Sequence, residues 1–227
     1  MQKKNIFIYS ILILLVVLIL MELFLPSLVE NRVEKYLSGQ LEEKENLQIE
    51  VISFPALKIL FSRADRIYLE ADVLNLEGLV LKDVSLHYSD VVLNDGFTGV
   101  NDRVNIMLTE EAVNNYVSKN YNQPKNLSIK FNPGQMFVEG DFDVFGYVIN
   151  FKTEGNLILE KEANRVVFVP GELQVKDYRF SEDIIRSILS GLNLSLDLNE
   201  LGLPLKFDQI LIRDEEVLLL GGMEGDG

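Results

Sequence analysis

The stretch DRIYLEADVLNLEGLVLKDVSLHYSDVVLND, residues 65–95, carries the longest regular pattern in the chain. Apolar residues alternate with polar ones along it, and residues that alternate in this way lie on one face of a β-strand. The turn residues Glu77-Gly78 and Asn94-Asp95-Gly96 divide the stretch, and Lys82-Asp83 can form a bulge. We therefore predict an antiparallel meander with one dry face, formed by Ile67, Leu69, Ala71, Val73, Leu79, Leu81, Val84, Leu86 and Tyr88.

Upstream of the meander, the run IFIYSILILLVVLILMELFL, residues 6–25, has no charged residue before Glu22. Twenty helical residues span about 30 Å, the thickness of the hydrocarbon core of a bilayer. Lys3 and Lys4 precede the run, and the next basic residue is Arg32. This asymmetry predicts a single transmembrane anchor (6–25), a cytoplasmic N-terminus (1–5) and an extracytoplasmic remainder.

A cleaved signal peptide is the main alternative for this run. Its apolar region would be about 7–15 residues long and would end in small residues at alternate positions. Here the apolar stretch is longer, and LFLPSLVENRV after it has no small-x-small site. We therefore prefer an uncleaved anchor to a signal peptide or a buried core helix.

Three amphipathic helices are expected after the anchor. Ser27 and Glu30 form a capping box directly after Pro26, so almost no linker separates the first of these helices from the anchor. This helix should end at the acidic residues 42–46. Thr109 followed by two glutamates predicts a second helix start. Ser181 caps a third helix over 181–192.

Alternating or apolar segments predict further strands, and FPALKILF (54–61) predicts a short apolar turn or helix. A terminal hairpin is expected over 207–222, and the last five residues (223–227) are expected to be a disordered tail. No Pro/Ser/Gly-rich linker divides 27–222, so we predict one extracytoplasmic domain of the α+β class with a mostly antiparallel sheet. The further strands are expected at 127–131, 136–144, 147–153, 156–160 and 166–169.

The composition excludes several function classes. The chain of 227 residues has 21 basic and 35 acidic residues, a net charge of −14, and such a chain repels nucleic acid and anionic surfaces. It has no cysteine, so disulfides, thiol catalysis and thiolate metal sites are impossible. We expect no nucleic-acid partner.

No catalytic or metal-binding set emerges from the residues. His87 is the only histidine and has no nucleophile or orienting partner in the sequence pattern. Carboxylate pairs such as Asp141 and Asp143 are expected by chance in so acidic a chain, and Asn94-Asp95-Gly96 lacks the order of a calcium loop. We therefore predict a non-enzymatic protein without metal or cofactor.

The remaining feature is apolar surface on strands and helices. These faces could close an ordinary core, or the sheet could curl around a helix and leave an apolar groove for acyl chains. Each buried methylene contributes about 0.8 kcal/mol, so one chain would be enough for binding. Periodicity alone leaves both possibilities open.

The layout resembles the LmeA-like phospholipid-binding family of bacterial envelope proteins. The resemblance runs over 28–222 and is carried by VISFPALKILFSRADRIYLEADVLNLEGLVLKDVSLHYSDVVLN (51–94), by the helix that begins at Thr109, and by the segment from VVFVPGELQVKDYRF (166–180) to VLLLGG (217–222). It implies a curved, tubular fold wrapped around a helix, and phospholipid binding without catalysis.

From these grounds we predict a membrane-anchored phospholipid-binding, and in one version lipid-transferring, protein. Lys58, Arg63 and Arg66 are candidate headgroup contacts, although as solvated charges they could simply keep the apolar turn soluble. The alternatives are a scaffolding module that binds envelope proteins through its acidic surface and, less favoured, an envelope hydrolase. The predicted groove residues are Phe54, Leu57, Leu60, Phe61, Ile67, Leu69, Val73, Leu81, Val84, Leu86, Ile184, Ile185, Ile188 and Leu189.

Overall fold

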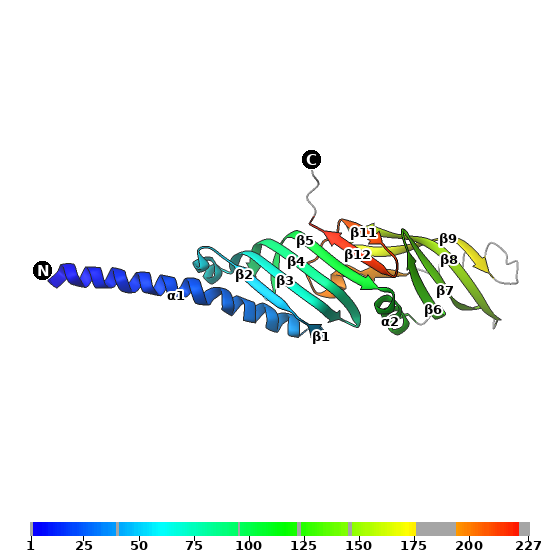
Figure 1. The fold of residues 1–227 in the computed structure, drawn as a ribbon, viewed down its shortest axis with the longest axis horizontal. Helices are drawn as coiled ribbons and strands as arrows, with labels where there is room; N and C mark the ends of the chain where they lie inside the picture. Colours follow the sequence, from blue (N-terminus) through cyan, green and yellow to red (C-terminus); the bar gives the residue numbers. More distant parts are fainter. Residues whose placement is uncertain are drawn as a thin grey trace, which may run out of the picture.

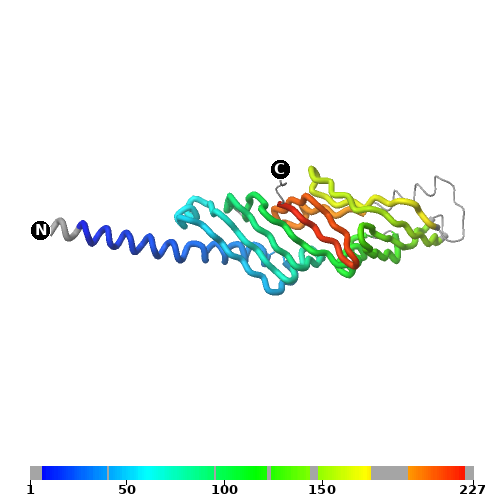
Figure 2. The backbone as a smooth tube through the Cα atoms, turned by 45° about the horizontal axis from the view of Figure 1, so that its top comes forward, coloured from blue at the N-terminus to red at the C-terminus, as the bar shows by residue number. Residues whose placement is uncertain are grey.

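A long helix projects from an elongated body of two antiparallel sheets (Figures 1 and 2). The computed structural model describes residues 2–39, 41–94, 96–121, 124–144, 147–175 and 194–222. The helix expected over 181–192 and the tail expected over 223–227 lie outside the described residues. The described elements are, in chain order, α1 (Gln2–Ser38), β1 (Leu41–Glu45), β2 (Gln48–Ile52), the 3-10 helix η1 (Ala56–Phe61), β3 (Arg63–Leu76), β4 (Leu79–Leu93), β5 (Phe97–Thr109), α2 (Glu110–Asn120), β6 (Lys125–Asn132), β7 (Gln135–Val144), β8 (Tyr147–Glu160), β9 (Arg165–Val175), β10 (Ser195–Asp197), the 3-10 helix η2 (Leu198–Leu201), β11 (Gln209–Ile212) and β12 (Glu216–Gly221).

The first sheet has the order β1-β3-β4-β5-β12-β11, and β2 also pairs with β3. The predicted meander is confirmed, because β3, β4 and β5 are consecutive antiparallel neighbours. Ile67, Leu69 and Ala71 pair with Tyr88, Leu86 and Val84, as predicted for the dry face. The prediction is wrong for Val73, which is half-buried and pairs with Lys82, because the alternation shifts after Ala71 and puts Leu74 and Leu76 on that face. At the first turn Glu77 and Gly78 both have positive φ, as a two-residue hairpin of this hand requires.

Helix α1 passes through Pro26 without a break, so the separate helix predicted from Ser27 is wrong. Proline removes one hydrogen bond, to the carbonyl four residues back, and a long helix can tolerate this loss when tertiary packing stabilises it. The packing here comes from Val29, Val33 and Leu37, which are buried on one face against the first sheet. The curved sheet around a helix and the α+β class are thereby confirmed (Figure 1).

The acidic residues expected to end that helix form a strand instead. Leu41–Glu45 is β1, and it pairs with the end of β3 from Leu41 opposite Leu76 to Glu45 opposite Val73. Pairing with β3 at the sheet edge satisfies the backbone hydrogen bonds of this segment, while its glutamate side chains face solvent. A local pattern of charges does not reveal such a pairing.

The second sheet has the order β10-β9-β8-β7-β6. The strand break expected at Gly155 is wrong, because β8 runs unbroken from Tyr147 to Glu160 with only a register shift beside this glycine. A Cβ at position 155 would lie 2.3 Å from the carbonyl oxygen of Val169. The glycine thus permits close approach of β9 and does not mark a turn.

The chain crosses from the second sheet back to the first through residues 194–208. Leu198, Leu201, Leu203 and Leu205 are buried on this path, together with Phe207. β10 begins the path in the second sheet, and β11 follows it in the first. The expected terminal hairpin is confirmed as β11 paired with β12. One core therefore runs through both sheets.

Candidate functional site

An apolar cavity lies where the two sheets and α2 meet. Its volume is about 70 Å³ and it is partly open to solvent. Strands of both sheets and one face of α2 contribute to its wall, so neither sheet alone forms it. The lining consists of Leu79, Leu108, Val113, Tyr116, Val117, Tyr121, Ile129, Phe131, Met136, Leu157, Val166, Phe168, Leu194, Ser195, Leu196, Ile210, Val217 and Leu219.

Helix α2 is fixed against the edge of β6 by side-chain hydrogen bonds. The hydroxyl of Thr109 caps the helix by accepting from the backbone N–H of Ala112, as the sequence predicted. Asn114 acts like an extra strand residue: its Oδ1 accepts from the N–H of Ile129 and its Nδ2 donates to the carbonyl of the same residue, both at 2.8 Å. The Glu110 carboxylate accepts from the N–H of Phe131 at 2.6 Å. The edge of β6 is thus satisfied, and α2 stays over the cavity.

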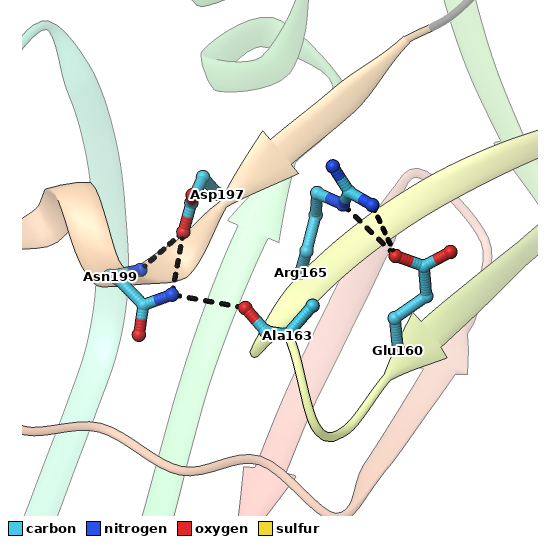
Figure 3. A network of polar contacts seen from close by, with 5 residues as sticks. All are labelled: Glu160, Ala163, Arg165, Asp197 and Asn199. Carbon is cyan, nitrogen blue, oxygen red and sulfur yellow. Dashed lines mark hydrogen bonds and ion pairs between the residues drawn. The ribbon is translucent and has the colours of Figure 1, made fainter.

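The wall formed by residues 194–196 is held by a polar network next to it (Figure 3). Asn199 donates from Nδ2 to the carbonyl of Ala163 at 3.0 Å and to the Asp197 carboxylate at 2.9 Å. Arg165 donates to the Glu160 carboxylate through Nε and Nη2, at 3.0 and 2.6 Å. The bond from Asn199 to Ala163 attaches the path that follows β10 to the turn between β8 and β9, and the Arg165–Glu160 pair links the two strands that flank this turn (Figure 3).

The chemistry of the cavity is that of a hydrocarbon surface. No charged side chain is among the described residues that line it. The hydroxyl of Tyr121 donates to the carbonyl of Ser195 at 2.6 Å, so this polar group is satisfied inside the protein. Burial raises the pKa of the Tyr116 hydroxyl, which therefore stays protonated and neutral. Such a lining can hold apolar matter but offers no acid or base.

The residues predicted for the groove fall into four groups, and none of the described members lines this cavity. Five of them, Ile67, Leu69, Leu81, Val84 and Leu86, are buried in the core under the first sheet. Val73 and Leu57 are half-buried, whereas Phe54, Leu60 and Phe61 are exposed around η1. The last four, Ile184, Ile185, Ile188 and Leu189, lie outside the described residues. Their contact with lipid stays a prediction.

The candidate headgroup residues gather around η1 and the start of β3. Lys58 forms an ion pair with Asp65 at 2.7 Å, and Arg66 donates to the Tyr68 hydroxyl at 3.4 Å. The hydrogen bond from Lys58, together with one from the backbone N–H of Phe54, lowers the pKa of Asp65. None of these charged residues is part of the cavity lining.

Nothing in the sequence distinguished the cavity lining from ordinary core. The helix that begins at Thr109 and the strand at 127–131 were predicted, but not the cavity between them. Periodicity gives the face but not what packs on it, since that depends on how two sheets meet in space. A gap between elements leaves no local sequence signal.

Comparison with known families gives one match. A sequence model of the family described as LmeA-like phospholipid-binding matches residues 20–222, nearly the whole chain. No curated protein and no solved structure matches the chain. The matched range includes every described residue of the cavity and begins within α1.

Proposed function

The chain belongs to the LmeA-like phospholipid-binding family, and from that premise we propose that it is a membrane-anchored, extracytoplasmic phospholipid-binding protein of the bacterial cell envelope. The apolar cavity between the two sheets receives the end of an acyl chain, and the rest of the lipid extends through the opening. The protein binds lipid without chemical conversion. Transfer of the lipid between membranes is the extended form of this proposal.

The observation that carries the proposal is the uncharged cavity held by α2. Hydrocarbon gains about 25 cal/mol for each Å² that it removes from water, so an open apolar cavity on an acidic protein is a favourable site for a chain end. The double hydrogen bond between Asn114 and Ile129 keeps the wall in place before lipid arrives. A preformed wall lowers the ordering cost of binding.

The properties of helix α1 support the proposed membrane anchor. It is the one helix in the described part of the chain that is long and apolar enough to cross a membrane, and its most apolar window is wholly exposed. Lys3 and Lys4 before the apolar run favour a cytoplasmic N-terminus by the positive-inside rule. Because α1 continues into the body without a linker, the body stays next to the membrane it is anchored in.

Photocrosslinking with the full chain tests the proposal. The protein is placed in phosphatidylglycerol–phosphatidylcholine vesicles that contain a phospholipid with a diazirine on its acyl chain, irradiated, digested and analysed by mass spectrometry. Adducts are expected on cavity-lining peptides of α2, β6 or β9 as well as on α1. Val117→Phe, which places a ring in the cavity, should remove the former and leave the latter.

Val100→Phe is the matched control, because Val100 is exposed on β5 and outside the cavity. It should leave all adducts unchanged. Adducts confined to α1 in the unmodified protein would overturn acyl-chain binding in the cavity, and so would cavity adducts that survive Val117→Phe. If overpacking unfolds that variant, Val113→Phe, at a half-buried lining position, serves in its place.

A further inference from the structure

Three large apolar side chains are exposed together around η1. Phe54 is 77% exposed, Leu60 56% and Phe61 79%. Single exposed apolar residues are ordinary on a protein surface, but three within eight residues of the chain form a patch. Among the other described residues of the body, the exposed apolar side chains include Leu28 on α1 and strand positions such as Val100 and Ile158.

The patch lies at the point where the exposed part of α1 enters the body. The Glu22 carboxylate accepts a hydrogen bond from the backbone N–H of Ala56 at 2.9 Å, which fixes η1 beside this turn of α1. Residues 7–20 of α1 are all exposed, and Leu25 is the first buried residue from residue 7 on. If residues 6–25 span the hydrocarbon core, Glu22 lies about 5 Å inside its outer end at 1.5 Å per residue. The patch is therefore level with the outer membrane interface.

The backbone around the patch is held in place from three sides. Asp65 accepts from the N–H of Phe54 and from the ammonium of Lys58, both at 2.7 Å. The carbonyl of Ser62 accepts from the N–H of Leu93 at 2.9 Å, and Ser62 itself has the left-handed conformation that ends η1. With Glu22 on the α1 side, these bonds keep the apolar side chains exposed and prevent the segment from folding inward.

The charge next to the patch suits a phospholipid surface. Lys58, Arg63 and Arg66 lie within nine residues of sequence in a chain of net charge −14. Arg63 and Arg66 are exposed at the start of β3, and in the described part of the chain neither forms an ion pair. Arginine guanidinium groups bind phosphates through paired hydrogen bonds.

We propose that η1 and its flanks form a membrane foot, defined by Phe54, Leu60, Phe61, Arg63 and Arg66, whose binding partner is the outer leaflet of the bilayer that α1 crosses. The three apolar side chains enter the interfacial region, and the two arginines meet lipid phosphates. With α1 and the foot both in the bilayer, the body is held at two points and cannot rotate freely on its anchor. This inference rests on the proposed anchoring by α1 but is independent of lipid in the cavity.

Single-cysteine labelling tests the foot, because the chain has no native cysteine. Ser62→Cys, Ile13→Cys and Val100→Cys are introduced separately in the full chain and labelled with the fluorophore NBD. Each protein is placed in phosphatidylglycerol–phosphatidylcholine vesicles with or without a doxyl-labelled phospholipid quencher. The label at position 62 should lose emission to the quencher as the label at position 13 does, whereas the label at position 100 should lose none.

A second variant separates insertion from mere proximity. Phe54→Ser with Phe61→Ser, in the Ser62→Cys background, should abolish the quenching at position 62 without changing the near-ultraviolet circular dichroism, because both rings are exposed. Quenching at position 13 without quenching at position 62 overturns the foot and leaves the anchor standing. No quenching at position 13 refutes the anchoring itself. If the emission of the label at position 62 changes only after a protein extract is added, and not with vesicles, the patch binds a protein partner, and this result also overturns the foot.

Discussion

The burial of Leu37 gives the sharpest test of how α1 serves the fold. Leu37 lies in the last turn of this helix, one residue before its end, is 1% exposed and belongs to the core under the first sheet. Truncation of such a leucine to alanine costs about 2–5 kcal/mol, from lost transfer energy and from the cavity left behind. We expect Leu37→Ala to lower the free energy of unfolding by about 3 kcal/mol, near the middle of that range.

The assay is urea unfolding of the full chain in detergent micelles, followed by the near-ultraviolet circular dichroism of its tyrosines. With a urea dependence of about 2 kcal/mol per M, the expected loss moves the midpoint by roughly 1.5 M. Leu28→Ala is the matched control: Leu28 has the same residue type in the same helix but is 64% exposed, so its truncation should cost less than about 0.5 kcal/mol. Equal midpoints for the two variants would refute the conclusion that α1 forms part of the domain core.

Two further predictions concern α2 and the second sheet. Thr109→Ala removes the cap of α2 and should cost about 1 kcal/mol in the same unfolding assay, while Thr98→Ala, at an exposed position on β5, should cost much less; equal costs would contradict the capping role. Hydrogen bonds from Asn126 and Asn150 lower the pKa of Asp141, so its stabilising contribution is fully present above the unfolded carboxyl pKa of about 3.9 and is lost as the pH falls through the lower folded value. The stability difference between the protein and Asp141→Asn should therefore be largest near neutral pH and shrink in acid, and a difference independent of pH would argue against this assignment.

Much of the local structure could be predicted because its causes are local. Alternation between polar and apolar residues predicted β3 and β4, and the turn at Glu77-Gly78 was predicted from its glycine, which tolerates positive φ. The cap at Thr109 followed from one hydroxyl and the two glutamates after it. Each of these signals acts within a few residues, so the rest of the chain does not alter it.

The errors arose where a distant partner outweighed the local signal. Glu30 was expected to cap a new helix, but its carboxylate accepts from the N–H of Val51 at 3.1 Å, and packing carries α1 through Pro26. Gly155 was expected to break a strand, yet it is the position where β9 comes too close for any side chain. In both cases the deciding atoms lie far away in sequence.

The sequence by itself determined most of the strands, the start of α2, the apolar run that begins α1, the acidic surface and the family, because composition, periodicity and apolar patterning are properties of the chain. Only the tertiary structure decided where apolar surface remains. It buried Ile67, Leu69 and Leu86 in the core, left Phe54 and Phe61 exposed beside α1, and opened a cavity between two sheets. The physical reason is that burial is a property of pairs of surfaces: a pattern specifies an apolar face, but the packing of distant elements determines whether protein, lipid or water covers it.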